Sequence, residues 1–489
     1  MRLGRDSLAR LPAAVGRPSF APDALEVGIV HLGIGAFHRA HQAAYTQEAL
    51  AVCAGRWGIC GVSPRSADTH DRLAAQDHLY TLIERGADTA RATIIGAVRE
   101  TLFAPADPAA VVARLAAPST RLVTLTITEK GYCLARRTGA LDAEHPDIRH
   151  DLAAAAPRSA IGYLVRGLAR RRVGEGGPLT LLSCDNLPAN GRALERAVSG
   201  FASLVDPDLE RWIADRVAFP CSMVDRIVPA STAETYRLAA SLTGVVDQAA
   251  VACETFRQWV IEDRFAAGRP AWEAVGVELV GDVAPYETMK IRLLNGSHST
   301  IAYLGYLAGY ATVAEAMRDD GLKALIQRLM ADEIAPTLAI PAGVDIAAYR
   351  RRLIERFADP GLAHRTWQIA MDGSQKLPQR LLGTIAERLA DGRPIPGLAL
   401  AVAAWMRYVT GRDEAGQPIE VVDPLADRLK AIAATAGGDA ATLVDRYAGI
   451  EEIFGSLGGR PDFKAAVAGA LTALQERGAR GAVAALVGR

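Results

Sequence analysis

The chain has 489 residues, of which 50% are hydrophobic and 22% are charged. This length and composition predict two or three domains with large cores. The formal net charge is zero, so the chain lacks the basic excess expected of a protein that binds nucleic acid. The six cysteines are widely spaced and form no CxxC pair, which predicts reduced and mostly buried thiols.

The sequence also predicts where the protein is found. Residues 1–20 lack the apolar run of a signal peptide, and no stretch approaches the ~20 apolar residues of a membrane span. We therefore expect a cytoplasmic protein that binds a small molecule and neither nucleic acid nor a membrane. Both a monomer and a small homo-oligomer remain open.

Strands and helices are predicted to alternate in the N-terminal part of the chain. Residues 27–32 form an apolar, β-branched run that predicts a buried strand, followed by a glycine turn and a helix over 40–50. Further strands are predicted at 57–62, 92–98, 121–128 and 179–184. Such alternation is typical of a parallel sheet that is covered on both faces.

The pattern changes near residue 285. From Met289 onward the sequence has helical periodicity and almost no convincing strands, and glycine and proline interrupt the pattern within residues 280–286. We therefore predict an α/β fold with a Rossmann-type parallel-sheet domain over residues 1–283. A mainly α-helical substrate and catalytic domain is predicted over residues 284–489.

The glycine turn after the first strand is predicted to bind a dinucleotide. Gly33 permits the tight turn, and Gly35 lets the backbone approach the phosphates at the start of a helix. His38 replaces the third glycine of the usual motif, so an ordinary strand–helix turn remains an alternative. Asp68 is the nearest acid for the ribose hydroxyls of NAD, whereas Arg65 would suit the extra phosphate of NADP. We expect NAD.

The segment from Tyr286 to His298 carries the strongest chemical signal. On an α-helix at about 100° per residue, Lys290, Asn295 and His298 share one side, and Glu287 is a neighbour of Lys290. Desolvation favours the neutral amine of a lysine, which can then act as a general base. The asparagine amide can donate to an alkoxide, and the histidine can hold a substrate hydroxyl. The alternative is a polar stripe that faces solvent.

Asn186 follows the strand predicted at 179–184, within the run Ser-Cys-Asp-Asn-Leu-Pro-Ala-Asn-Gly. Ligands of parallel sheets meet the carboxyl ends of the strands, so Asn186 is placed to supply a second amide. Because Asp, Asn, Pro and Gly all form turns, ordinary turn chemistry is the alternative interpretation.

These segments together resemble the polyol-specific long-chain dehydrogenases over nearly the whole chain. The similar stretches are GIGAFHRAHQ at 33–42, TITEKGYC at 126–133, SCDNLPANG at 183–191, FPCSMVDRIVP at 219–229, FRQWVIEDRFAAGRPAWE at 256–273, KIRLLNGSHS at 290–299 and DGSQKLPQR at 372–380. The VDRI block and the KxxxxNxxH block are the specific ones.

The resemblance implies roles for individual residues. Lys290 matches the catalytic base, Asn186 and Asn295 match the pair that polarises the carbonyl, His298 orients the substrate, and Glu287 gates proton release from the lysine. The cofactor-binding residues that it implies are Gly33, Gly35, Ala36, Phe37, Arg39, Asp68, Thr128 and Asp225. The family uses no metal, so the HxxH pair at His38 and His41 is not predicted to bind zinc.

Four cations predict the substrate class. Lys130, Arg365, Lys376 and Arg380 resemble the fructuronate-reducing branch of this family more than the mannitol branch. They would bind the carboxylate of a uronate by charge-assisted hydrogen bonds, whereas a neutral hexitol offers them no charge. Ordinary surface charges are the alternative interpretation. We therefore expect reversible reduction of D-fructuronate to D-mannonate. Interconversion of mannitol and fructose, or of another polyol pair, is the alternative. A non-catalytic NAD-binding sensor would require gaps in the catalytic set, and the sequence contains none.

Overall fold

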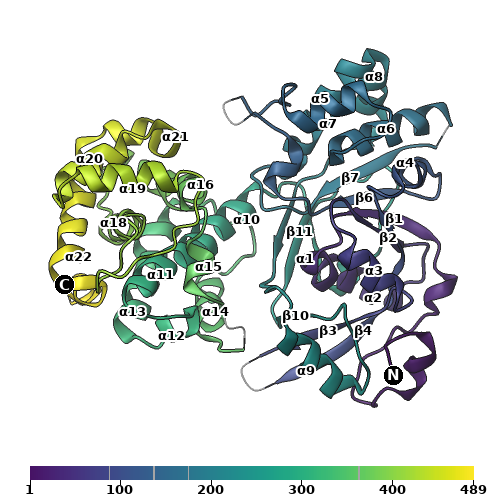
Figure 1. Ribbon diagram of the computed structural model, residues 1–489, viewed down its shortest axis with the longest axis horizontal. Coiled ribbons are helices and arrows are strands. Elements are labelled where there is room, and N and C mark those ends of the chain that lie inside the picture. Colours follow the sequence, from purple (N-terminus) through teal and green to yellow (C-terminus); the bar gives the residue numbers. More distant parts are fainter. Residues whose placement is uncertain (87–88, 136–137, 175, 362–363, 489) are drawn as a thin grey trace. The chain divides into compact units, whose positions relative to one another are not determined.

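The computed structural model describes residues 1–86, 89–135, 138–174, 176–361 and 364–488. These residues form two compact units, Met1–Ala284 and Pro285–Arg489, which we call unit 1 and unit 2 (Figure 1). Within the described ranges, no helix combines the length and the apolar character that crossing a bilayer requires.

A six-stranded parallel sheet forms the centre of unit 1. Its strands are β1 (Val27–Leu32), β2 (Gly58–Ser63), β5 (Val98–Phe103), β6 (Leu122–Leu125), β7 (Leu179–Ser183) and β8 (Val217–Ala218), in the order β5-β2-β1-β6-β7-β8. In the register, Val30 of β1 lies opposite Cys60 of β2 and Val123 of β6. The chain leaves β1 toward β2 on one side and later returns to β6 on the other, which is the doubly wound order. The predicted Rossmann-type sheet is confirmed.

Two smaller sheets in unit 1 were not predicted. One contains β10 (Val251–Glu254), β3 (Tyr80–Arg85) and β4 (Ala90–Ile95), and the other contains β12 (Glu278–Val280), β11 (Gln258–Glu262) and β9 (Ser222–Asp225). Each contains one antiparallel and one parallel pair. Four of these six strands have only three to five residues, so their hydrophobic pattern in the sequence is weak.

The single strand predicted over residues 92–98 is wrong, because β4 and β5 divide this run between two sheets. Gly96 lies at the division, where a Cβ would approach the Cγ atoms of Pro18 and Pro22 to 2.8 and 3.0 Å. Its N–H donates to Gln47 Oε1 at 2.6 Å instead of to a strand. A continuous apolar run does not reveal such a turn, because residues 94–98 are buried both within the strands and between them.

Helices cover one face of the six-stranded sheet, and helices together with the smaller sheets cover the other. The helical segments of unit 1 are η1 (Arg5–Arg10), η2 (Pro22–Ala24), α1 (Ala36–Ala40), α2 (Gln42–Val52), α3 (Asp68–Ala74), α4 (Pro108–Ala116), η3 (Glu129–Tyr132), α5 (Pro146–Ala153), α6 (Ala160–Val173), α7 (Asn190–Val205), α8 (Pro207–Arg216), α9 (Ala233–Thr243) and η4 (Trp272–Val275). Val30 packs in one core with Leu164 of α6 and Phe201 of α7. Ile29 packs in a second core with Tyr45 of α2 and Trp259 of β11. Neighbouring residues of β1 therefore serve both faces.

The helix predicted over residues 40–50 is also corrected. Helix α1 begins earlier, at Ala36, and the chain breaks at His41, whose φ of −122° and ψ of −84° are not helical. The His41 ring bonds to the carbonyl oxygen of Gln258 at 2.9 Å and accepts from Gln42 Nε2 at 3.1 Å. This tertiary bond ties the break to β11, and periodicity alone does not show it.

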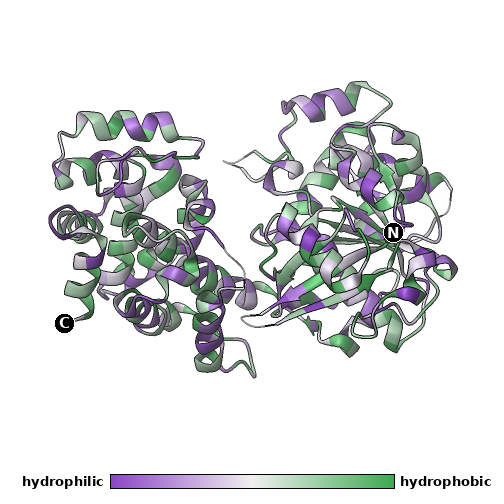
Figure 2. Cartoon of the chain, turned by 60° about the horizontal axis from the view of Figure 1, so that its bottom comes forward, coloured by the Kyte–Doolittle hydropathy of each residue, from purple (hydrophilic) through white to green (hydrophobic). Residues whose placement is uncertain are grey.

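Unit 2 is mainly helical, as predicted, and no strand longer than an isolated bridge occurs among its described residues. Its segments, after α10 (Ala284–Met289), are η5 (Lys290–Asn295), α11 (Gly296–Leu307), α12 (Val313–Ala316), α13 (Asp320–Arg328), η6 (Leu329–Ile334), η7 (Ala335–Thr337), α14 (Ile346–Ala358), α15 (Thr366–Ala370), α16 (Gly373–Leu377), η8 (Pro378–Leu382), α17 (Gly383–Ala390), α18 (Pro396–Tyr408), α19 (Ala426–Thr435), α20 (Ala440–Ala448), α21 (Glu451–Phe454), η9 (Gly455–Gly459) and α22 (Pro461–Val487). Helices α11 and α18 are buried on almost every side and form the centre of the core. Figure 2 shows hydrophilic and hydrophobic residues side by side on many outer helices, as expected where only one face is buried.

Candidate functional site

The glycine turn of unit 1 lies at the carboxyl end of β1. Gly33 has a φ of +97°, and a Cβ there would come within 2.2 Å of the carbonyl oxygen of Thr126, just beyond β6. The Thr126 hydroxyl donates to the Gly33 carbonyl oxygen at 2.8 Å. The segments after β1 and β6 therefore touch at the point where the strand order reverses, which is where such sheets bind ligands.

Gly35 differs from Gly33 in what surrounds it. Its φ is an ordinary −79°, it is exposed, and the nearest atom to a Cβ would be the Gly33 carbonyl oxygen at 3.8 Å. The fold itself therefore does not demand glycine here. A ligand whose phosphates approach the backbone would demand it, so the turn fits a dinucleotide.

The residues that follow the turn make contacts that hold it in place. Ala36 begins α1, and the ring of Phe37 stacks on His41 at 5.0 Å between centroids. The guanidinium of Arg39 is buried and bonds to the carbonyl oxygens of Gly35 and Ala249. Arg39 therefore stabilises the turn through hydrogen bonds in the interior of unit 1.

The two histidines of this motif, and His31 of β1 beside them, are buried and neutral at pH 7. His31 and His38 stack with their ring centroids 3.4 Å apart, and burial lowers the pKa of His31 to about 3. Burial also lowers the pKa of His38 well below its usual value and that of His41 to about 3. Among the residues that the structure describes, no group of three or more His, Cys, Asp or Glu is arranged to hold a metal ion.

The other cofactor residues implied by the resemblance are spread over unit 1. Asp68 is exposed at the start of α3, and Arg65 is exposed in the preceding turn. Asp225 is buried at the end of β9, opposite Gln258. The next residue, Arg226, donates to the carbonyl oxygens of Ala40 and Glu254 from a fully buried guanidinium, so it joins elements of the fold.

The carboxyl ends of β6 and β7 bring three further predicted residues to the surface of unit 1. Thr128 and Lys130 are exposed in the segment after β6, and Asn186 is exposed after β7. Sequence reasoning passed over Asp185, which lies between β7 and Asn186. Its carboxylate accepts hydrogen bonds from the backbone N–H groups of Ile127 and Thr128 at 3.0 and 2.9 Å.

In unit 2, the KxxxxNxxH segment is buried. Lys290 is 5% exposed and His298 is 7% exposed, which excludes the interpretation of a polar stripe in solvent. The α-helical positions predicted for these residues are wrong in one respect, because η5, from Lys290 to Asn295, is a π-helical turn. Its i→i+5 hydrogen bonds widen the helix, and π-turns are frequent at functional sites.

His298 lies within a group of cations. Burial lowers its pKa well below the usual value, and the charges of Arg380, Arg356 and Lys290 add to this effect. Its ring also lies 5.3 Å from that of His364, centroid to centroid. Sequence reasoning missed Arg356 and His364, because they lie far along the chain in segments without a recognisable motif.

The predicted substrate cations fall in different places. Arg380 donates to Ser299 Oγ at 3.1 Å and to the Asn295 carbonyl oxygen at 3.4 Å, so it lies against the KxxxxNxxH segment. Lys376 donates to the carbonyl oxygen of Ile369 at 3.2 Å. The burial of His364, together with the charge of Lys376, lowers the pKa of His364 to about 4. Arg365 is exposed at the start of α15, and Lys130 belongs to unit 1.

Glu287 is half-buried in α10, one turn before Lys290. This spacing places the two residues on neighbouring positions of the helix surface. A carboxylate at this position can exchange a proton with a neighbouring amine, which is the role that the resemblance implies for it.

Comparison with known proteins agrees with these features. Residues 27–274 match the family model of the mannitol dehydrogenase Rossmann domain, and residues 282–475 match that of the mannitol dehydrogenase C-terminal domain. D-mannonate oxidoreductase of Escherichia coli (strain K12) is 49% identical over 478 residues, which cover 96% of this chain and 98% of that protein. A mannitol 2-dehydrogenase of Aspergillus fumigatus is 42% identical over 470 residues and 93% of both chains.

A solved structure of Pseudomonas fluorescens mannitol 2-dehydrogenase, in a ternary complex with NAD and D-mannitol, superposes with a TM-score of 0.91. It is 39% identical, and the match covers 100% of both chains. The resemblance noted in the sequence is confirmed: the chain belongs to the mannitol dehydrogenase family.

Proposed function

We propose that this protein is an NAD-dependent oxidoreductase that interconverts a sugar-derived secondary alcohol and its ketone, with Lys290 as the general acid and base. The observation that carries the proposal is the burial of Lys290 on a π-helical turn beside His298. Few lysines are buried without a task, because an ammonium group is costly to desolvate. The names of the relatives support the class of reaction.

NAD, when bound, supplies the hydride acceptor for oxidation and, in its reduced form, the donor for reduction. The glycine turn of Gly33 and Gly35 is proposed to hold its pyrophosphate, with Asp68 for the ribose hydroxyls. The exposure of Asp68 leaves its carboxylate available for such a bond. Arg65 is exposed close by and would serve NADP, so the preference for NAD rests on the relative solved with NAD.

The proton is handled by residues of unit 2. In the oxidative direction the neutral amine of Lys290 takes the proton from the substrate hydroxyl, and in the reductive direction the ammonium group returns it. The Asn295 amide donates to the substrate oxygen as negative charge develops there, and Asn186 is proposed to supply a second amide. Glu287 exchanges the proton of the lysine with solvent. The neutral His298 ring accepts or donates a hydrogen bond to a further hydroxyl.

The charges around His298 favour an anionic substrate. Arg356 and Arg380 both act on the buried ring, and guanidinium groups bind a carboxylate such as that of a sugar acid by charge-assisted hydrogen bonds. We therefore propose D-mannonate and D-fructuronate as the substrate pair, in agreement with the E. coli relative. The mannitol 2-dehydrogenase relatives make D-mannitol and D-fructose the second candidate.

A panel of ketone substrates tests the proposal. NADH oxidation is followed by its absorbance with D-fructuronate, D-fructose and a pentulose at equal concentrations. The proposal expects the highest kcat/KM with fructuronate. A higher value with fructose would assign the second candidate, and no oxidation with any of them would favour an NAD-binding sensor.

A further inference from the structure

Asp185 joins the ends of two neighbouring strands in unit 1. Its carboxylate accepts from the N–H groups of Ile127 and Thr128, in the segment after β6, although Asp185 itself follows β7. The hydroxyl of Tyr132 donates to the same carboxylate at 2.7 Å and also lies within hydrogen-bond reach of Ser183 Oγ. One side chain therefore receives three donors from a single loop, residues 126–132.

The loop that Asp185 holds is strained. Thr128 has a φ of 64° and a ψ of 162°, a region of backbone space that is occupied almost only by glycine. A β-branched residue resists this conformation, because its Cβ meets the neighbouring carbonyl groups. Such a conformation persists only where the surroundings fix it, and the bond from the Thr128 N–H to Asp185 is a direct means of doing so.

We propose that Asp185 is a positioning residue that holds the strained Thr128 backbone and thereby sets the geometry of the site. The inference rests on the proposed function, because Thr128, Lys130 and Asn186 are the residues that this loop and the end of β7 present. Asp185 is adjacent to Asn186 in the chain, so its hydrogen bonds also restrain the backbone that carries Asn186. A 1 Å displacement of such groups can reduce turnover about a hundredfold.

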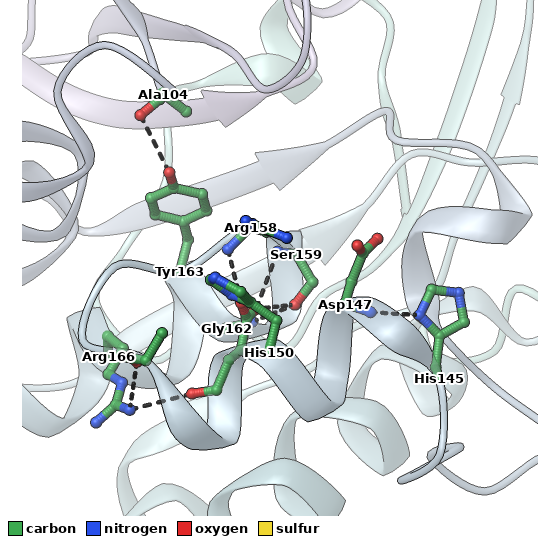
Figure 3. Close-up of polar contacts among 11 residues, drawn as sticks. Ala104, His145, Asp147, His150, Arg158, Ser159, Gly162, Tyr163 and Arg166 are labelled. Carbon is green, nitrogen blue, oxygen red and sulfur yellow. Dashed lines mark hydrogen bonds and ion pairs between the residues drawn. The ribbon is translucent and has the colours of Figure 1, made fainter.

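A second carboxylate in unit 1 has nearly the same bonds without the strain. Asp151 accepts from the N–H groups of Arg158 and Ser159 at 2.7 and 2.9 Å and from the Ser159 hydroxyl at 2.6 Å, and its carboxylate also lies 3.0 Å from His150 Nδ1. Figure 3 shows Arg158 and Ser159 beside the start of α6. Ser159 has an ordinary φ of −82°. Asp151 is thus a matched control for the loss of a buried carboxylate that caps backbone N–H groups.

The test compares Asp185→Asn with Asp151→Asn in the full-length protein. In either variant the amide retains one oxygen and turns an NH2 group toward an N–H donor that it cannot satisfy. We expect a similar fall in the melting temperature for both. Only Asp185→Asn should reduce kcat, by on the order of tenfold to a hundredfold, and weaken NADH binding measured by fluorescence. Equal kcat values in the two variants would overturn the inference.

A double-substitution cycle tests the strain directly. Glycine adopts a positive φ without a steric penalty, so Thr128→Gly should make the loop independent of Asp185. In that background, Asp185→Asn should change kcat by no more than about threefold. A loss as large as in the Thr128 background would refute the role of strain.

Two further measurements keep the test decisive. If Asp185→Asn does not fold, Tyr132→Phe removes one of the three donors to Asp185 and should lower kcat in the same direction by a smaller factor. An unchanged kcat in Tyr132→Phe would then count against the inference. If none of the tested ketones supports NADH oxidation by the unmodified protein, the proposed function fails. The NADH dissociation constants of the same variants then still decide the role of Asp185.

Discussion

The imidazole rings of His298 and His364 meet edge to face in unit 2, with their centroids 5.3 Å apart and their planes at 90°. Both rings are neutral near pH 7, because burial lowers the pKa of each, to about 4 for His364 and well below its usual value for His298. Neutral rings can share a pocket with several cations, whereas two imidazolium ions would repel both them and each other.

This relationship predicts how stability depends on pH. Below about pH 6.5 the unfolded chain protonates His364 while the folded protein does not, so the free energy of unfolding falls as the pH decreases toward 4. His364→Asn removes this contribution. Between pH 7.5 and pH 5.0, urea denaturation should show that the free energy of unfolding falls by about 1–2 kcal/mol less in the variant than in the unmodified protein. Equal losses in both proteins would show that His364 is already protonated in the folded state.

The two glycines of the turn should respond differently to alanine. Gly33→Ala places a Cβ 2.2 Å from the Thr126 carbonyl oxygen at a φ of +97°, so it should destabilise unit 1 by at least about 1–3 kcal/mol. Gly35→Ala meets no protein atom closer than 3.8 Å and should leave the melting temperature nearly unchanged. It should nevertheless weaken NADH binding, measured by fluorescence titration, by at least tenfold, which corresponds to about 1.4 kcal/mol. Unchanged NADH affinity in Gly35→Ala would place the dinucleotide elsewhere.

Arg380 should discriminate between charged and neutral substrates. Arg380→Gln removes a cation that lies against η5 and the His298 ring. We expect KM for D-fructuronate to rise about tenfold to a hundredfold, since a hydrogen bond to a charged group contributes about 1.5–3 kcal/mol, and KM for D-fructose to change much less. Arg428→Gln, which breaks a half-exposed ion pair with Glu452, is the control. Equal changes for both substrates would rule out a carboxylate at Arg380.

Periodicity and motif spacing were sufficient for the architecture and insufficient for long-range contacts. The apolar run of β1, the glycine turn and the helical pattern after residue 285 predicted the parallel sheet and the helical unit 2. The apolar run over 92–98 wrongly predicted a single strand, because the chain turns at Gly96 between β4 and β5. Periodicity likewise assumes a regular α-helix, whereas η5 is a π-helical turn. The chain packs closely just after this turn, where a Cβ at Gly296 would lie 2.8 Å from the Arg380 carbonyl oxygen.

The candidate site likewise contains residues that the sequence predicts and residues that only the packing brings together. Lys290, Asn295 and His298 are close in sequence, so one motif predicts them together. Arg356 and His364 reach His298 only through the packing of unit 2. Asp185 stands beside a predicted residue, but the sequence does not predict its role, because its bonds to the loop after β6 depend on the order of strands in the sheet.

Lys290→Ala is the most direct test of the proposed mechanism. The ketone reductase activity and the dissociation constant of NADH are measured side by side, with Lys464→Ala as a control for the loss of a surface lysine that pairs with Asp445. General acid–base catalysis contributes about 10²–10⁴-fold, so kcat should fall by about a thousandfold while the NADH affinity stays within about twofold of the unmodified protein. A kcat within tenfold of the unmodified value, or an equal loss of turnover and NADH binding, would contradict the role of Lys290 as the proton donor.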